Sequence, residues 1–405
     1  MLCQFSFKNF RSYKDEAVFD LQAVATSKDE TKNFKDSLLR DSDGKEFLPV
    51  SVIYGPNAGG KSNVIRAFHC VVAIVMNPIY RLKSGIDDKR IPFDCAPFNF
   101  DENSAYNPTD FTLFFRPDDE YEYKYFISLK QEKILEENMY RKELKKCSRT
   151  LTVFERSKGE ITLGSCIRKA SINTQINDSL PLLSSLGINY KLEPIDRAIS
   201  WFKSCVVFNY ADYVQEKIKL EQNDEEKQKF LSLINEMGIN ISDYKIENLP
   251  ETNSHNISVE HIVNDKSFIM DLIDESEGTK KLFNFFPYAL KAISCGGVLM
   301  ADELEVKLHP KLLKYIIMLF KNPEINTKNA QLVFTSHDIS TMKSTVFRTD
   351  EIWFACKRAD ESSDLYSLYE IKDENGNHIQ PTAAFDKQYL EGRYGADPYF
   401  RNMMD

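Results

Sequence analysis

Apolar and polar positions change their spacing along the chain and so predict different elements. Residues 2–22 alternate with a period of two, which predicts a β-hairpin at a sheet edge. Five short strands with the same period and turn sequences between them follow in 110–165, and predict an antiparallel sheet. Residues 180–245 are predicted to be helical. Within them the Glu-, Gln- and Lys-rich stretch 213–237 is expected to form a solvated lid or short arm.

Three other apolar runs do not alternate. They are residues 50–54, 295–301 and 331–335, and such runs are typical of strands buried on both faces of a parallel sheet. After residue 265 the pattern reads helix, strand, helix, strand, helix, strand, with Pro310 in the first turn of an amphipathic helix. We therefore predict an α/β fold, with a parallel or mixed sheet flanked by helices and a separate antiparallel β subdomain.

The first of these runs leads into a glycine-rich loop. GPNAGGKS begins at Gly55 and is followed by a helical pattern that we expect to reach about Met76. This is G-x-x-x-x-G-K-[ST] between a strand and a helix, the P-loop pattern, in which glycines let several N–H groups point at one anion. Lys61 is predicted to reach the β- and γ-phosphates and Ser62 to bind Mg²⁺. Chance produces the bare pattern in roughly one or two per cent of such chains, so we conclude that the protein binds a nucleotide.

A second buried strand ends in two acids, in the sequence GVLMADE. After an apolar strand two acids often mark only a solvated turn, but beside a P-loop they form a Walker B element. Asp302 is then predicted to hold Mg²⁺ through water or Ser62, and Glu303 to orient and polarise the attacking water. His337 follows the next strand, in FTSHD, at the place where a sensor of the γ-phosphate is expected.

A third motif opens a helix with SEGTKK. Ser276 is a good N-cap residue, and Gly278 permits close approach of another backbone. The simple interpretation is a capped helix. The functional one makes this helix N-terminus a second anion site, aimed at a nucleotide that another subunit holds.

Composition narrows the class of protein. The formal net charge of −9 over 405 residues argues against a surface devoted wholly to nucleic acid, although a local basic groove stays open. The best basic segment, 141–149, is more simply a wet strand edge. The eight cysteines include no CxxC pair, so we predict neither a zinc site nor a disulfide framework. Without a signal peptide or an apolar run near 18 residues, we expect a cytoplasmic protein that contacts no membrane.

The order of the motifs resembles a known family. NFRS (9–12), GPNAGGKS, SEGTKK, LMADELEVKLHP and FTSHD stand as in the ABC-type ATPase heads of the SMC, RecF and OLD group. With RTDEIWFACK (348–357) and YLEGRYGADPYF (389–400), the chain more closely resembles the RloA-type ATPases of bacterial anti-phage and abortive-infection loci. It is loosely similar to the PARIS and Septu ATPases. The likeness covers 1–75 and 265–400 well.

That resemblance implies a P-loop NTPase of the ABC-ATPase head type, with ATP and Mg²⁺ as cofactors. Residues 1–175 would form the N-terminal part of the head, with the P-loop and the β subdomain. Residues 176–264 would be a helical lid or arm insertion, and 265–405 would complete the head.

The resemblance also implies a head-to-tail homodimer that holds two ATP molecules between its heads. Each P-loop would face Ser276 and Gly278 of the other chain, and such a contact closes as a twofold pair. The loop 305–310 would cross the interface, and a separate effector protein, a nuclease, would be the partner. The remaining residues expected at the nucleotide are Arg11, Asn57, Gly59, Gly60 and Asn63.

The sequence departs from the pattern in a few places. Glu277 and Thr279 stand where transporters carry Gly and Gln, and Lys307 replaces a common Ser in the interface loop. No glutamine of the kind that couples Mg²⁺ to a lid can be placed between 80 and 110.

Other functions stay open at this stage. The main alternative is a RecF- or SMC-like DNA-binding ATPase of repair or chromosome maintenance, against which stand the acidic charge and the missing long coiled coil. An ATP-binding scaffold that hardly turns over and a transporter's cytosolic subunit are weaker options. GTP is disfavoured because no N-K-x-D motif follows the P-loop. A nuclease within the chain is disfavoured because about 65 residues after His337 are too few for an added domain.

Overall fold

The structure is a computed structural model of the chain. It describes the following residues: 1–25, 34, 36–84, 95–131, 133–145, 148–167, 172–209, 224–249, 254–373 and 375–396.

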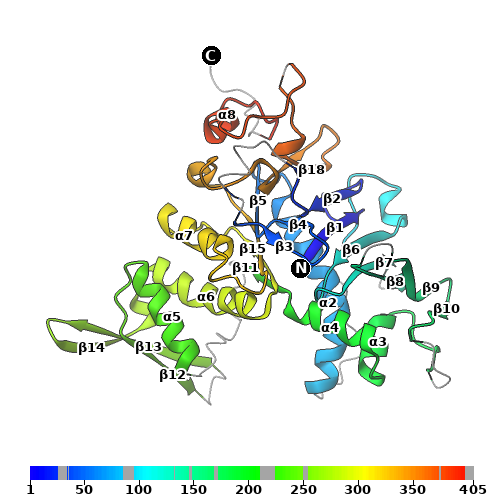
Figure 1. Ribbon diagram of the computed structural model, residues 1–405, viewed down its shortest axis with the longest axis horizontal. Coiled ribbons are helices and arrows are strands. Elements are labelled where there is room, and N and C mark those ends of the chain that lie inside the picture. The colour runs from blue at the N-terminus through cyan, green and yellow to red at the C-terminus, as the bar shows by residue number, and fades with distance from the viewer. Residues whose placement is uncertain are drawn as a thin grey trace.

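A six-stranded sheet runs through the centre of the molecule, in the order β11-β15-β16-β5-β17-β18 (Figure 1). Its strands are parallel except β18, which pairs antiparallel with β17 at one edge. Along β15, Val298 and Met300 belong to one hydrophobic core, and Leu299 and Ala301 to another. Both faces are buried, as the unalternating runs predicted. The strands are β5 (Val50–Tyr54), β11 (Val206–Asn209), β15 (Val298–Asp302), β16 (Gln331–Thr335), β17 (Ile352–Lys357) and β18 (Ser363–Ser367).

A seven-stranded antiparallel sheet has the order β10-β9-β8-β7-β6-β1-β2. It confirms the N-terminal hairpin and the predicted antiparallel region. The hairpin and the antiparallel region belong to one sheet because β1 pairs with β6. The strands are β1 (Leu2–Lys8), β2 (Ala17–Asp20), β6 (Thr109–Phe115), β7 (Tyr121–Lys130), β8 (Lys133–Glu143), β9 (Thr150–Ser157) and β10 (Glu160–Leu163).

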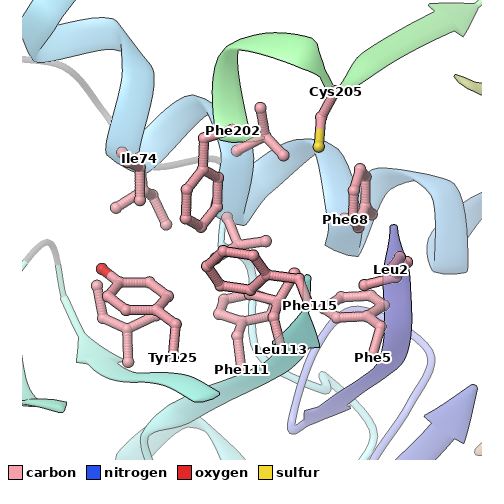
Figure 2. Close-up of a cluster of buried hydrophobic side chains, with 14 of the residues drawn as sticks. Leu2, Phe5, Phe68, Ile74, Phe111, Leu113, Phe115, Tyr125, Phe202 and Cys205 are labelled. Atoms are coloured by element: carbon pink, nitrogen blue, oxygen red, sulfur yellow. The ribbon is translucent and has the colours of Figure 1, made fainter. Parts of the chain in front are cut away.

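Helix α2 (Lys61–Ser84) packs against this antiparallel sheet. Figure 2 shows Phe68 and Ile74 of the helix over Phe111 and Leu113 of β6. We predicted an end near Met76, before Pro78, but the helix continues through Pro78 to Ser84. Apolar burial around the proline explains the difference, because tertiary packing can offset the roughly 3 kcal/mol that an interior proline costs a helix.

By length and composition alone, Lys61–Tyr80 of α2 could cross a membrane. However, 56% of that apolar window is buried inside the protein. The helix also begins at the glycine-rich loop and fills the first hydrophobic core. These features are those of a core helix.

Helices α6 (Glu277–Cys295) and α7 (Pro310–Lys321) cover one face of the central sheet, the face to which Leu299 and Ala301 of β15 belong. The predicted strand start at residue 295 was two to three residues early, because Cys295 is the last residue of α6. Gly296 follows with φ 70°, the left-handed C-cap conformation that glycine adopts without a steric cost. Val298 then opens β15.

The prediction of helix throughout 180–245 was only partly right. Helices α3 (Leu182–Asn189), α4 (Glu193–Ser204) and α5 (Asp224–Glu236) are present. Between them, however, β11 joins the central sheet beside β15. A four-residue apolar strand cannot be told from helix by periodicity, and its pairing partner lies far along the chain. Residues 213–223 of the expected lid fall outside the described residues, and the three-part division of the chain stays a prediction.

A small separate sheet has the order β12-β13-β14. The expected helix between β16 and β17 is replaced, in the described chain, by 3₁₀ turns. The remaining elements are β3 (Leu39–Arg40), β4 (Glu46–Phe47), β12 (Asp243–Leu249), β13 (Ser254–Val263), β14 (Lys266–Asp271), α8 (Phe385–Leu390) and the 3₁₀ turns η1 (Ser104–Tyr106), η3 (Leu272–Asp274), η4 (Ile339–Thr341), η5 (Thr349–Glu351) and η6 (Leu368–Glu370).

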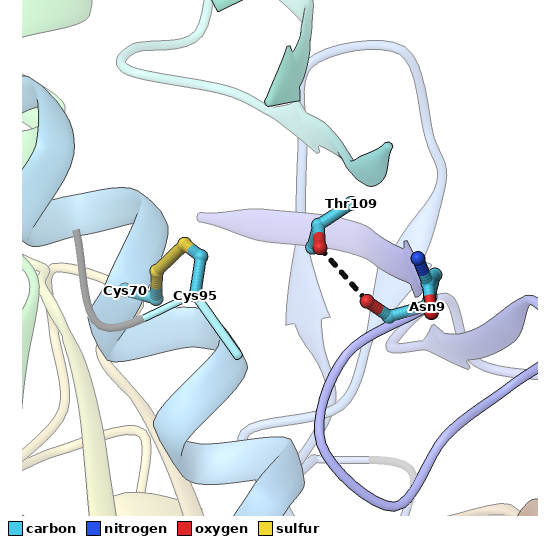
Figure 3. Close-up of a disulfide and its surroundings, with 4 residues drawn as sticks. All are labelled: Asn9, Cys70, Cys95 and Thr109. Atoms are coloured by element: carbon cyan, nitrogen blue, oxygen red, sulfur yellow. Dashed lines mark hydrogen bonds between the residues drawn. A yellow bond between two sulfur atoms is a disulfide. The ribbon is translucent and has the colours of Figure 1, made fainter. Parts of the chain in front are cut away.

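A disulfide joins Cys70 of α2 to Cys95 (Figure 3). We predicted no disulfide, because the cysteines are scattered without a recognisable spacing. The two partners are 25 residues apart in sequence and meet only once the segment at 95 folds back on α2. Beyond it, Thr109 donates to the backbone oxygen of Asn9 at 2.8 Å, which ties the same region to the N-terminal hairpin.

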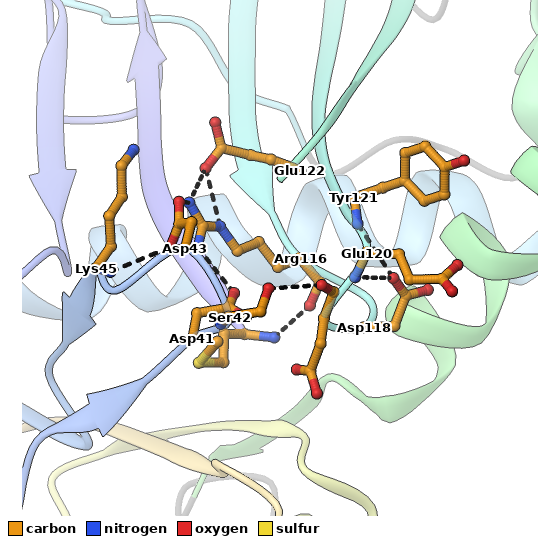
Figure 4. Close-up of polar contacts among 11 residues, drawn as sticks. Asp41, Ser42, Asp43, Lys45, Arg116, Asp118, Glu120, Tyr121 and Glu122 are labelled. Atoms are coloured by element: carbon orange, nitrogen blue, oxygen red, sulfur yellow. Dashed lines mark hydrogen bonds and ion pairs between the residues drawn. The ribbon is translucent and has the colours of Figure 1, made fainter. Parts of the chain in front are cut away.

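Buried charges join the turn after β3 to the antiparallel sheet. The Arg116 side chain is 1% exposed and forms ion pairs at 2.8 Å with Asp41, Asp43 and Glu122 (Figure 4). Asp41 is itself fully buried in its side chain. Loss of the guanidinium would leave that carboxylate desolvated and without its cation.

We expect Arg116→Met to lower the free energy of unfolding by about 3 kcal/mol, because removing one partner of a buried pair leaves an uncompensated charge. Urea unfolding measures the change. The control is Arg40→Met, whose pair with Glu46 is half-exposed and should contribute less than about 1 kcal/mol. Equal effects of the two substitutions would contradict the expected role of Arg116.

Candidate nucleotide site

The loop after β5 has the backbone shape of an anion cradle. Gly55 has φ +145° and Gly60 has φ +111°, backbone angles that residues other than glycine rarely adopt. A Cβ on Gly55 would lie 2.0 Å from the carbonyl oxygen of Ala355, and one on Gly59 would lie 2.5 Å from the same atom. The predicted glycines are therefore required by the close packing of the loop against β17.

Lys61 opens α2, and its amine folds over the loop. The Nζ atom donates to the carbonyl oxygens of Gly55 and Pro56, both at 2.9 Å. Burial lowers the pKa of Lys61 to about 8, and the nearby carboxylate of Asp302 works in the opposite direction. An anion in the loop would favour the charged amine further.

Ser62, Asp302 and Thr335 meet where β15 and β16 end. The Oδ1 atom of Asp302 accepts hydrogen bonds from Ser62 Oγ at 3.0 Å and from Thr335 Oγ1 at 2.6 Å. Asp302 is 8% exposed. The structure thus brings together the two residues that we predicted as metal ligands, and their oxygen atoms are the ligand type that Mg²⁺ prefers.

Glu303 follows in an unusual backbone conformation. Its φ is 48°, in the left-handed region, and its N–H donates to Thr335 Oγ1 at 2.7 Å. Its carbonyl oxygen accepts from Nζ of Lys281 at 2.9 Å. Main-chain bonds on both sides fix the residue while its side chain remains exposed.

Lys281, about one turn into α6, is completely buried. Besides Glu303 it binds the carbonyl oxygen of Val306 at 2.8 Å. Burial lowers the pKa of its amine to about 8, against the opposing effect of Glu305 and Glu303. The amine therefore ties helix α6 to the loop that follows the two acids.

His337 lies beyond the end of β16 and is connected to the acids through Glu305. The N–H of His337 donates to Oε1 of Glu305 at 2.5 Å. Burial lowers the pKa of the imidazole, and the nearby amine of Lys61 adds to that effect. His337 is therefore mainly neutral at pH 7, and the positive charge of Lys61 disfavours protonation of its ring.

The N-terminal turn lies against the P-loop. Asn63 Nδ2 donates to Ser12 Oγ at 2.8 Å, and the hydroxyl of Tyr13 reaches the carbonyl oxygen of Gly60 at 3.4 Å. Arg11 occupies this turn with φ 51°, and Asn57 is exposed at the loop tip. Arg11 and Asn63 are thus near the loop as expected, but the described amide of Asn63 is bound to Ser12.

Ser276 and Gly278 lie at the start of α6, beside the loop that follows the two acids. Ser276 Oγ caps α6 by accepting from the N–H of Thr279 at 3.1 Å, which confirms the N-cap. A Cβ on Gly278 would lie 3.2 Å from the carbonyl oxygen of Lys307. Lys307 and Lys280 both pair with Glu277 at 2.5 Å, and hydrogen bonds from these two lysines lower the pKa of Glu277 to about 2. The start of α6 therefore contacts the loop that follows Asp302 and Glu303, through Lys307.

Sequence reasoning missed three residues of the site: Thr335, Lys281 and Glu305. All three lie in or beside motifs that we singled out. Thr335 was assigned only as the end of a strand, and Lys281 only as part of a helix. Thr335 could have been identified from the register of β15 and β16. That register places Thr335, which follows Phe334, beside Asp302, which follows Ala301.

We expect Thr335→Val to lower the free energy of unfolding by about 1–3 kcal/mol, since it leaves the N–H of Glu303 without its acceptor and removes one of the two hydrogen bonds to Asp302 Oδ1. Chemical denaturation of both proteins measures the loss. Thr335→Ser keeps the hydroxyl and should stay within about 1 kcal/mol of the parent. A valine variant as stable as the serine variant would show that these hydrogen bonds contribute little.

Comparison with known proteins agrees with this geometry. A family model described as "AAA domain, putative AbiEii toxin, Type IV TA system" matches residues 50–343, which include the P-loop, both acids and His337. No curated protein matches the chain. A solved structure described as "Crystal structure of the SmcHead bound to the C-winged helix domain of ScpA" is similar, with 13% identity and a TM-score of 0.46 over 91% of this chain and 97% of that one.

The architecture around the matched motifs is a mixed sheet flanked by helices, with an antiparallel sheet beside it. The match to the family model extends over more than half of the chain. The chain therefore belongs to this AAA-domain family, whose description connects it with abortive infection.

Proposed function

We propose that this protein is a Mg²⁺-dependent ATPase whose ATP-driven head-to-tail dimerisation regulates or scaffolds a partner effector in bacterial anti-phage defence. The observation that supports the proposal most is the hydrogen-bonded group Ser62–Asp302–Thr335 at the mouth of the P-loop. It gathers a hydroxyl and a carboxylate beside a lysine that burial has partly desolvated.

The residues present fit the two cofactors. Ser62 and Asp302 are the residues that would hold Mg²⁺, and the Gly55–Gly60 loop with Lys61 would bind the phosphates of ATP. When bound, the metal neutralises negative charge that develops on the transferred phosphoryl group. The loop amides and Lys61 orient the triphosphate and shield it from water.

Glu303 and His337 are proposed as the catalytic pair. The exposed carboxylate of Glu303 orients the attacking water and accepts its proton. Its backbone is held by Thr335 and Lys281, so the carboxylate starts from a defined position. His337, kept mainly neutral by burial, can donate one ring N–H toward the γ-phosphate.

A second chain is needed to complete the site. In the described chain Ser276 is exposed, and its hydrogen bonds run to Glu275 and Thr279. The first turn of the 19-residue helix α6 has amides without an intrahelical acceptor, as at any helix start. We propose that they and Gly278 bind the γ-phosphate held by the other subunit, as the resemblance implies.

Lys281 would connect the two sites of such a dimer. It lies in the helix that serves the partner's nucleotide, and it holds the main chain at Glu303 and Val306 of its own site. A shift of α6 on ATP binding would therefore move the acids as well. This connection offers a physical route by which hydrolysis at one site depends on closure of the other.

The effector and its activity remain proposals, as do the cytoplasmic location and the closer likeness to RloA-type ATPases. We propose a separate nuclease as the effector. The DNA-binding alternative gains no support from the basic segment 141–149, which begins at the end of β8, since Arg141 pairs with Glu193 and Lys145 with Glu143. Residues 146–147 of that segment lie beyond the described part.

Glu303→Gln should slow ATP turnover at least about 100-fold, because the water loses its general base, and should accumulate ATP-bound dimers. Phosphate release and size-exclusion chromatography with ATP measure the two effects. Lys61→Ala serves as the control and should lose nucleotide binding itself. Hydrolysis at the normal rate by the glutamine variant would remove Glu303 from its catalytic role.

The shared site can be tested by mixing two inactive variants. Lys61→Ala destroys one chain's P-loop, and Ser276→Arg blocks the helix start that serves the partner. A mixed dimer retains one intact composite site, so an equimolar mixture should recover about one quarter of the parent ATPase rate by statistical pairing.

The matched control mixes Lys61→Ala with Asp302→Ala. Both lesions then fall on the P-loop side of the site, and every combination lacks a complete site. Recovery in this control, or its absence in the first mixture when both variants are folded and the mixture forms dimers in the presence of ATP, would contradict the head-to-tail arrangement.

A further inference from the structure

Strands β13 and β14 form a hairpin that projects beyond α5 and α6 at one end of the molecule (Figure 1). Its two-residue turn, Asn264–Asp265, has positive φ at both positions (50° and 62°), as tight hairpins require. The strands pair over six positions without a register shift. His261 of β13 lies 2.8 Å from Glu275, which fixes the hairpin to the segment before α6. The hairpin is thus a regular, anchored element.

Strand β14 has an unprotected edge. It is the last strand of the order β12-β13-β14, and all six of its side chains are exposed. It carries no proline and no bulge, and its charged residues, Lys266 and Asp271, stand only at its two ends. Its unpaired backbone groups can therefore accept another strand.

The exposed side chains of the hairpin are apolar to an unusual degree. Phe268 is 55% exposed, Ile269 66% and Met270 37%. Ile262 and Val263 of β13 are 61% and 53% exposed. By the strand register, Phe268, Met270 and Val263 lie on one face of the hairpin, and Ile269 and Ile262 lie on the other. Soluble proteins rarely leave so many large apolar side chains together in water unless the surface serves an interaction.

We propose that the occupant of this edge is a second copy of the chain, with β14 pairing antiparallel to β14 of the partner subunit. The charges of the strand favour this orientation. Lys266 stands at one end and Asp271 at the other, with the uncharged Ser-Phe-Ile-Met between them. Antiparallel pairing brings the positive end of one strand beside the negative end of the other, whereas parallel pairing would bring like ends together.

Symmetry and charge together select the register. A twofold axis between antiparallel edge strands is perpendicular to the sheet, so opposed residues must lie on the same face of β14. An axis at Ile269 places Phe268 opposite Met270 of the partner subunit, an aromatic–thioether contact, and Ser267 opposite Asp271 of the partner subunit. An axis at Phe268 would instead oppose Asp265 to Asp271 of the partner subunit, a repulsive pair. We therefore place the axis at Ile269.

This contact differs from the nucleotide-dependent one proposed above and does not depend on it. Five residue pairs within β14 form a small interface by the standards of stable dimers, so we expect weak association of the free chain. Two different twofold contacts on one subunit join head-to-tail dimers into a larger closed or chain-like assembly. The hairpin would therefore set the oligomer above the dimer.

The first experiment measures the mass of the nucleotide-free chain by analytical ultracentrifugation. At about 100 µM the parent should contain a reversible dimer, as expected for micromolar-range affinity. Ile269→Asp places two carboxylates on the axis and should abolish it, while Met318→Asp, on an exposed apolar residue of α7, should leave it unchanged. Circular dichroism checks that each variant is folded. Lys61→Ala should still form this dimer, which separates the result from the fate of the ATPase proposal.

A second experiment tests the register. A cysteine at the axis faces its own copy, so Ile269→Cys should form an intermolecular disulfide on mild oxidation. Ser267→Cys, on the same face of the same strand, faces Asp271 of the partner subunit and should not cross-link above the parent level. A monomeric parent at 100 µM, an unaffected dimer in Ile269→Asp, equal cross-linking by both cysteines, or binding of this hairpin by a different protein in place of a second copy would overturn the proposal.

Discussion

The hydrogen bonds that Asp302 accepts from Ser62 and Thr335 are the interaction on which the site depends. A carboxylate as buried as Asp302 is costly unless polar partners replace the water that it loses. Here one hydroxyl comes from the first turn of α2 and the other from the end of β16. The bonds therefore fix the helix and the two strands relative to one another, and the same oxygen atoms are the ones offered to a cation. Stability and metal chemistry meet in one side chain.

Two buried lysines fix the two loops that lie beside Asp302. Lys61 binds carbonyl oxygens of the P-loop, and Lys281 binds carbonyl oxygens of the loop after the acids. In both, burial lowers the pKa of the amine to about 8, so both are mainly charged at pH 7. A charge bonded to neutral carbonyls stabilises loop geometry and retains attraction for an anion. For Lys61 that anion would be the triphosphate of the proposed ATPase; for Lys281 the carboxylates of Glu305 and Glu303 favour the charged amine.

The parts of the site that could be predicted are those written in consecutive residues. Lys61 and Ser62 follow a glycine loop, and Asp302 and Glu303 end an apolar run, so strand, loop and chemistry appear together in the sequence. Thr335 could not be predicted in the same way. Its role depends on the parallel register in which Ala301 stands opposite Phe334, and sequence spacing alone does not provide that alignment. Strand β11 and the Cys70–Cys95 disulfide were missed for the same reason, since each depends on a partner brought near by folding.

The start of α6 offers a physical basis for the shared site proposed above. Its cap uses the hydroxyl of Ser276 for the N–H of Thr279, which leaves the earlier amides of Glu277 and Gly278 without an intrahelical acceptor, as at any helix start. Glu277, in the first turn, pairs with Lys280 and Lys307. In the proposed dimer, a triphosphate held by another copy would accept from these amides and lie at the positive end of the helix dipole. The pair between Lys307 and Glu277 also attaches the loop after the two acids to the helix start, so binding there would act on the loop that follows Glu303.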